Sequence, residues 1–130
     1  MQHNAARNQN VMYSCLEIAK ESTTDFVLIQ ESWIVTNNNT IYTISHLFYH
    51  CILPNIVNNV RSRVLIYARK QSKFNFYYKI DLTSDSDIII IDVSESKIQP
   101  FHLINIYNEK TLDPESNSIN YTVKRSFQQI

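Results

Sequence analysis

Short, unbroken apolar runs constrain the fold of this chain more than any other feature of its sequence. Residues 26–29 read FVLI, residues 63–68 read RVLIYA and are apolar after the arginine, and residues 88–91 are all isoleucine. A strand with one face in water alternates apolar and polar side chains, whereas a strand covered on both faces does not. The runs are also far too short to span a membrane. We therefore expect strands that are covered on both faces, in a protein without a membrane segment.

A helix is predicted near each end of the chain. Within residues 8–20 the apolar side chains recur at helical spacing, and Asn8 or Asn10 can serve as the N-cap. Residues 120–130 show the same spacing and begin with a possible cap, Asn120. Helical periodicity thus brackets the apolar runs.

Further strands are predicted between the apolar runs and after them. Residues 74–80 alternate, and residues 101–107 read FHLINIY. Residues 32–61 are polar, show no clear period and are expected to be irregular. Because this order does not repeat as βαβ, it favours an α+β fold with a mixed, mostly antiparallel sheet over a doubly wound parallel sheet.

Length and composition indicate how many domains the chain forms and in which cellular compartment it is expected. With 130 residues, of which 44% are hydrophobic, residues 1–130 fit one domain. The first ten residues are polar and no apolar h-region follows them, so no secretory signal is visible. We interpret Cys15 and Cys51 as reduced thiols and expect an intracellular protein of the nucleus or cytoplasm. The net charge of zero gives the whole chain no electrostatic footprint for nucleic acid.

Glu31 stands where the first apolar run leaves the core. In layered α/β architectures this edge of a sheet is where ligands and metals are usually held. A carboxylate there is either functional or an ordinary solvated strand end, and the residue alone favours the second interpretation.

The context of Glu31 resembles a known family. The stretch VLIQE (27–31) resembles the metal-binding strand of the endonuclease/exonuclease/phosphatase superfamily, and specifically the nuclease domain encoded in fungal non-LTR retrotransposons. The supporting stretches are QHN (2–4), RSRVLIYARK (61–70), and LINIYNEK followed by YTVKRS (103–126). The resemblance spans nearly the whole chain but only about the first half of the family's domain. It implies an incomplete domain, a partial layered sandwich with flanking helices.

The resemblance also implies a chemistry and the residues for it. Asn4 matches the family's asparagine, Glu31 its metal-binding glutamate, and Tyr107 its active-site tyrosine. The implied activity is DNA cleavage with Mg²⁺, a hard cation that prefers carboxylate oxygens and retained water. A tyrosine hydroxyl can donate a hydrogen bond to a phosphoryl oxygen as charge builds there. DNA is thus the implied partner, with no small-molecule cofactor and no implied partner protein.

The departures from the family matter as much as the matches. A chain with no glycine lacks the family's Gly-Asp-Phe-Asn motif, and no Ser-Asp pair here is followed by histidine. His102 precedes Tyr107 and does not match the catalytic histidine. We therefore expect a truncated, inactive endonuclease domain in which Mg²⁺ binding is weak or absent. The alternative is a non-enzymatic remnant or interaction module.

One other metal pattern is present. His46 and His50 are four residues apart, and on a helix both rings would share a face as a zinc pair, with Cys51 adjacent. Without a HExxH pattern or a second pair of ligands, a position in a substrate-side loop or packing in the core is favoured for these histidines.

Overall fold

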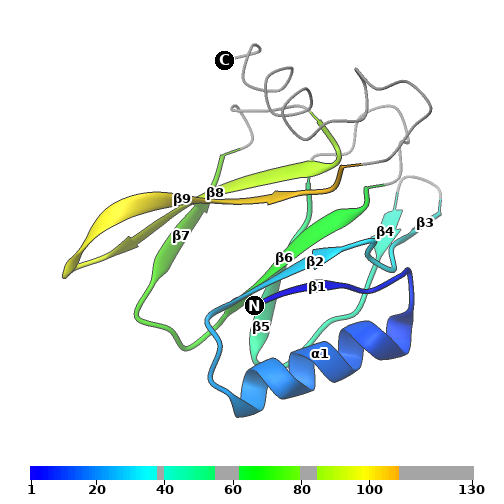
Figure 1. The fold of residues 1–130 in the computed structure, drawn as a ribbon, viewed down its shortest axis with the longest axis horizontal. Helices are drawn as coiled ribbons and strands as arrows, with labels where there is room; N and C mark the ends of the chain where they lie inside the picture. Colours follow the sequence, from blue (N-terminus) through cyan, green and yellow to red (C-terminus); the bar gives the residue numbers. More distant parts are fainter. Residues whose placement is uncertain (38–39, 55–61, 80–84, 109–130) are drawn as a thin grey trace.

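The computed structural model describes residues 1–37, 40–54, 62–79 and 85–108 of the chain. Within these ranges the chain forms one helix and nine strands, shown in Figure 1. The helix is α1 (Gln9–Glu21). The strands are β1 (Gln2–Asn4), β2 (Phe26–Gln30), β3 (Val35–Asn37), β4 (Thr40–Tyr42), β5 (Tyr49–Ile52), β6 (Val64–Arg69), β7 (Asn75–Tyr78), β8 (Ile88–Glu95) and β9 (Ile98–Ile106).

Helix α1 forms where the sequence predicts it. The Asn8 side chain is the N-cap, and its Oδ1 accepts hydrogen bonds from the backbone N–H groups of Asn10 at 2.9 Å and Val11 at 3.1 Å. One face of the helix is buried, through Met12, Cys15, Leu16 and Ala19. The apolar stripe therefore packs on the sheet as its spacing indicates.

The central sheet has the strand order β1-β2-β6-β5, with β1 parallel to β2 and the other pairs antiparallel. Strands β7, β8 and β9 form a second, antiparallel sheet. Helix α1 lies on one side of the central sheet, and β8 and β9 lie on the other (Figure 1). Because β6 is covered on both faces, Val64 to Ala68 are at most 1% exposed. The prediction of a mixed, mostly antiparallel arrangement is confirmed.

One core joins these layers. The buried side chains of α1 and of the central sheet form a single cluster with Ile89, Ile91 and Val93 of β8. Trp33, just after β2, packs at the edge of this cluster. The unbroken apolar runs of the sequence are thus the strands at the centre of the molecule.

The prediction that residues 32–61 are irregular is wrong for part of that segment. Strands β3 and β4 pair with each other, and β5 forms an edge of the central sheet by pairing with β6. Elements of three or four residues are too short to show a period, and β5 is fixed by its partner strand rather than by its own pattern. The helix predicted at residues 120–130 lies outside the described residues.

Both cysteines are free thiols, with Cys15 buried and Cys51 exposed. In the described ranges, no helix combines the length and the hydropathy that a membrane crossing requires.

Candidate functional site at the ends of β2 and β9

The candidate site lies where strands of the two sheets end together, at Glu31 and Tyr107. We call this place the corner. Glu31 directly follows β2 of the central sheet, and Tyr107 directly follows β9 of the second sheet. The Tyr107 hydroxyl donates a hydrogen bond of 3.0 Å to the Glu31 Oε1 atom. The structure therefore brings together two of the three residues that the family resemblance selects.

The third residue, Asn4, reaches the same edge by another route. It ends β1 and is the parallel partner of Gln30, the neighbour of Glu31. Its side chain is exposed, and its Oδ1 accepts a 2.9 Å hydrogen bond from the Ala6 N–H. Asn4 thus lies at the same end of the sheet as Glu31, and its side chain bonds within the turn that follows β1.

The backbone at this corner is strained. Ala6, Arg7 and Glu31 have positive φ angles of 49°, 58° and 48°, in the left-handed region that favours glycine. A left-handed conformation costs a non-glycine residue roughly 1–2 kcal/mol. The corner is held by the Arg7 N–H, which donates to the Glu31 carbonyl at 2.7 Å. Strain concentrated in this way is typical of functional sites.

Asn105 of β9, which sequence reasoning did not single out, links the corner to the core. Its Nδ2 donates to the Ile29 carbonyl at 3.0 Å and to the Leu65 carbonyl at 2.8 Å. Its Oδ1 accepts from Gln30 Nε2 at 2.6 Å. The available signal was an amide inside the apolar stretch LINIY, where a strand that crosses a core is expected to be apolar.

Arg63 is a second residue that the sequence analysis missed. Its guanidinium lies over the Tyr107 ring at 5.0 Å from the centroid, and its Nε is 3.4 Å from the Asp87 Oδ1. The side chains of Arg63 and Asp87 are 20% and 18% exposed. The corner therefore holds a cation beside the phenol and two carboxylates near it.

This environment keeps Tyr107 a hydrogen-bond donor. Burial, followed by the hydrogen bond to Glu31, raises the pKa of the Tyr107 hydroxyl, and Arg63 opposes this effect. A phenol is already protonated at neutral pH, since its ordinary pKa is about 10. The upward direction of the pKa means that the proton stays on Tyr107.

The described residues do not fit a complete Mg²⁺ site. Nowhere in the described ranges do three or more His, Cys, Asp or Glu side chains lie close enough to hold a metal ion together. Glu31 offers one carboxylate, and its Oε1 already accepts the Tyr107 hydrogen bond. Mg²⁺ demands near-octahedral oxygen coordination, so a single carboxylate holds it weakly.

His46 and His50 do not form a zinc pair. His46 Nε2 is 2.8 Å from Glu17 Oε1, and its Nδ1 accepts a 3.1 Å hydrogen bond from the Phe48 N–H, so both ring nitrogens are engaged. His50 is exposed on β5 and its ring lies 6.2 Å from that of Phe76. The predicted loop position agrees with His46, which lies between β4 and β5. It is wrong for His50, which lies exposed on β5 and so is neither in a loop nor packed in the core.

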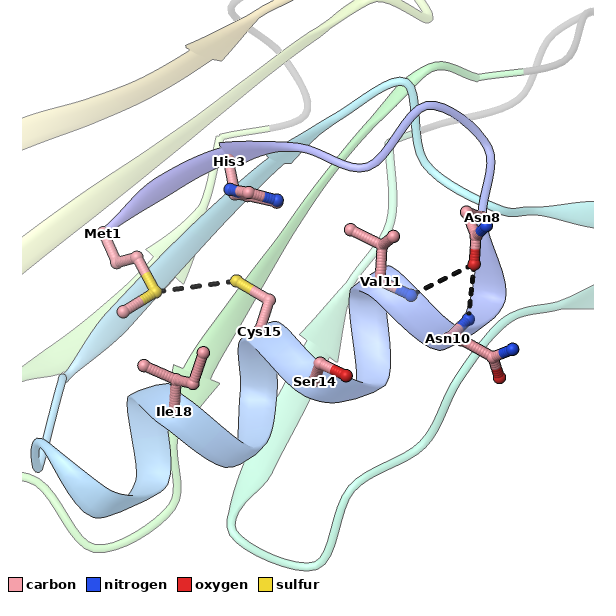
Figure 2. Close-up of a pocket in the computed structure, with 8 residues that line it drawn as sticks. All are labelled: Met1, His3, Asn8, Asn10, Val11, Ser14, Cys15 and Ile18. Carbon is pink, nitrogen blue, oxygen red and sulfur yellow. Dashed lines mark hydrogen bonds between the residues drawn. The ribbon is translucent and has the colours of Figure 1, made fainter.

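A groove with a largely apolar lining lies away from the corner. It has a volume of about 520 Å³ and runs between β1 and α1, as Figure 2 shows. Met1 and His3 line the β1 side, and Val11, Cys15 and Ile18 line the helix side. Asn4, Glu31 and Tyr107 do not line this groove, so the groove is separate from the candidate site.

Comparison with known proteins bears on the fold. No family model matches the sequence, and no curated protein matches it. Among solved structures, the endonuclease domain of TRAS1, a telomere-specific non-LTR retrotransposon, is similar, with a TM-score of 0.69 and 15% sequence identity. The match covers 98% of this chain and 51% of that one, so this chain spans about half the length of its neighbour. The chain therefore has an endonuclease-like fold.

Proposed function

We propose that this chain is a nuclease-type domain of fungal non-LTR retrotransposon origin that binds the phosphodiester backbone of DNA at the Glu31–Tyr107 corner. The observation that carries the proposal is the 3.0 Å hydrogen bond between these residues, which lie far apart in the sequence. The likeness to a retrotransposon endonuclease domain supports the nuclease-type assignment. The strained backbone around Glu31 supports the position of the site.

Each residue has a role in this proposal. Tyr107 keeps its proton and, when a phosphate arrives, can donate it in a hydrogen bond to a phosphoryl oxygen. Asn4 adds an amide that orients the phosphate without adding charge. Glu31 is the proposed ligand for a divalent cation such as Mg²⁺. Binding is weak because a single carboxylate holds Mg²⁺ poorly and the second carboxylate of the corner, Asp87, is paired with Arg63.

We further propose that the chain does not cleave DNA by itself. Cleavage needs a general base, which is typically worth about 10² to 10⁴ in rate. The chain has four histidines, and each is placed elsewhere. His3 lines the groove, His46 contacts Glu17, His50 contacts Phe76, and His102 pairs with Asp92. The corner therefore binds a phosphodiester without a histidine to deprotonate the attacking water.

The first experiment tests cleavage. A supercoiled plasmid is incubated with the purified chain and Mg²⁺ or Mn²⁺, beside the Glu31→Ala variant. We expect the plasmid to stay supercoiled in both reactions. Metal-dependent conversion to open circles by the wild type, abolished in Glu31→Ala, would restore the enzyme interpretation and refute the inactive one.

The second experiment tests binding at the corner. Fluorescence anisotropy of a labelled DNA duplex is measured first at physiological salt, where non-specific binding typically has a Kd on the order of 10⁻⁴ to 10⁻⁶ M, and then at low salt, where binding tightens. A chain without net charge is expected at the weak end of this range. Tyr107→Phe should weaken binding several-fold, because it removes the donor to phosphate. The matched control is Tyr77→Phe, at a tyrosine that is 70% exposed on β7. Equal affinity of wild type, Tyr107→Phe and Tyr77→Phe contradicts the proposed site.

The alternative function is a non-enzymatic interaction module. It is favoured by the groove beside β1, since β1 is the edge strand of the central sheet and Ile18 in the groove is 61% exposed. An exposed apolar groove beside an edge strand suits an extended polypeptide that pairs with that strand. If every corner variant binds DNA as tightly as the wild type, this alternative is favoured.

A further inference from the structure

Asn105 is a buried amide whose side chain has three hydrogen-bond partners. Its residue is 1% exposed, although β9 crosses an apolar core at this point. An amide buried without hydrogen bonds is costly, so its partners indicate why the position is not apolar. Three hydrogen bonds, all of 3.0 Å or less, satisfy the side chain.

These bonds cross from one sheet to the other. Ile29 and Leu65, whose carbonyls accept from Asn105 Nδ2, are directly paired residues of β2 and β6 in the central sheet. Asn105 itself belongs to β9 of the second sheet. An asparagine supplies two hydrogen-bond donors and an acceptor in one short side chain, whereas an aspartate or a leucine does not supply both.

The Asn105 hydrogen bonds lie next to the corner in both chain segments that form it. Asn105 precedes Tyr107 by two residues, and side chains two apart along extended chain point to the same side. On the central sheet, Ile29 and Gln30 immediately precede Glu31. The bonds of Asn105 and the Tyr107–Glu31 bond therefore form consecutive links between the same two chain segments.

We propose that Asn105 is a positioning residue: it fixes the end of β9 against β2 and β6 so that the Tyr107 hydroxyl stays on Glu31. Asn105 does not touch the bound phosphodiester and acts through Tyr107. The assignment rests on the proposed function for the meaning of the corner. Its test measures the geometry of the corner directly and needs neither DNA nor cleavage.

The experiment measures the NMR chemical shift of Tyr107 Cζ at pH 7 in protein labelled with ¹³C at tyrosine Cζ, with the signal assigned by its loss in Tyr107→Phe. This shift depends on the hydrogen bond of the hydroxyl, so Glu31→Ala, which removes the acceptor, gives the reference for a broken contact. Asn105→Ala should move the Tyr107 signal toward that reference, because the hydroxyl no longer stays on Glu31.

A control separates positioning from general stability. Leu103 lies on the same strand and packs partly buried against the core. Leu103→Ala removes apolar contacts and leaves the Asn105 bonds in place, so it should lower the melting temperature while the Tyr107 Cζ shift stays at its wild-type value. An Asn105→Ala protein that melts earlier but keeps the wild-type Tyr107 Cζ shift overturns the proposal.

A second variant decides the question if Asn105→Ala does not fold. Gln30→Ala removes one link, the 2.6 Å bond to Asn105 Oδ1, at a residue that is only partly buried. We expect the Tyr107 Cζ signal to move less far in the same direction, and an unchanged signal in the folded variant would refute the positioning role. If DNA binding is absent while these shifts occur, the proposed function fails and the role of Asn105 stands.

Discussion

At the scale of single residues, the corner joins a phenol, a carboxylate and a guanidinium from three separate parts of the chain. Tyr107 donates to Glu31, and Arg63 lies over the Tyr107 ring. The carboxylate favours the protonated phenol, and the guanidinium favours the ionised one. Because burial and Glu31 have the larger effect, the pKa of Tyr107 is raised.

This raised pKa makes stability depend on pH at the alkaline end. The folded pKa of Tyr107 lies above the unfolded value of about 10, so the hydroxyl stabilises the fold below that value and loses its contribution as pH rises through the folded pKa. We expect Tyr107→Phe to lower the unfolding free energy by about 1 kcal/mol at pH 8. Above about pH 10 the difference from the wild type should shrink.

The measurement for this prediction is urea unfolding at several pH values between 8 and 11, on the wild type and the variant in parallel. Other tyrosines ionise in the same range, and subtracting the two curves removes their effect. A difference between the curves that is constant with pH contradicts the prediction.

At the scale of secondary-structure elements, the sequence predicted the helix and the strands whose residues repeat a pattern over several positions. The apolar stripe of α1 and the unbroken runs of β2, β6 and β8 were identified from residue order alone. Strands β3, β4 and β5 were not, since elements of at most four residues form through a partner strand.

The same distinction holds for the candidate site. Glu31 and Tyr107 were selected because they match a family motif, and the structure brings them into contact. Asn105 and Arg63 were missed because their partners lie in other segments of the chain, and a local sequence pattern does not indicate which residues will be in contact. An amide within an apolar strand was the one visible sign of such a partner.

Helix α1 allows a matched test of its cap. Asn8 caps the helix through its side chain, whereas Asn10 is exposed within the first turn. Asn8→Ala should lower the unfolding free energy by about 1 kcal/mol because two backbone N–H groups lose their acceptor. Asn10→Ala should change it by only a few tenths of a kcal/mol, about the level expected for a surface substitution. Equal unfolding midpoints for the two variants in urea would argue against the cap.

At the scale of the whole molecule, one face of the helical layer keeps apolar surface in water. Ile18 is 61% exposed in the groove beside β1, and Leu47 is 86% exposed elsewhere. Exposed apolar patches bind hydrophobic dyes and promote association. We expect the purified chain to bind such a dye and to associate as its concentration rises.

The groove should contribute most of the dye signal. Ile18→Lys places a charge in the groove at a helical position that tolerates lysine, and should reduce dye fluorescence several-fold with little change in melting temperature. Leu47→Lys, the control outside the groove, should reduce it less. A sharply melting monomer that binds no dye would show that the apolar surface is not exposed as described.

The left-handed corner has a consequence for how the molecule opens. Ala6, Arg7 and Glu31 keep their positive φ angles while two backbone bonds hold, from Ala5 N–H to the Gln30 carbonyl and from Arg7 N–H to the Glu31 carbonyl. When these bonds break, the three residues can relax together, so detachment of β1 at this end is expected to be all-or-none. Native-state hydrogen exchange would then give the Ala5 and Arg7 amides one common opening free energy. The corner that carries the candidate site would exist either whole or not at all, with Asn4 and Glu31 lost from it in the same event.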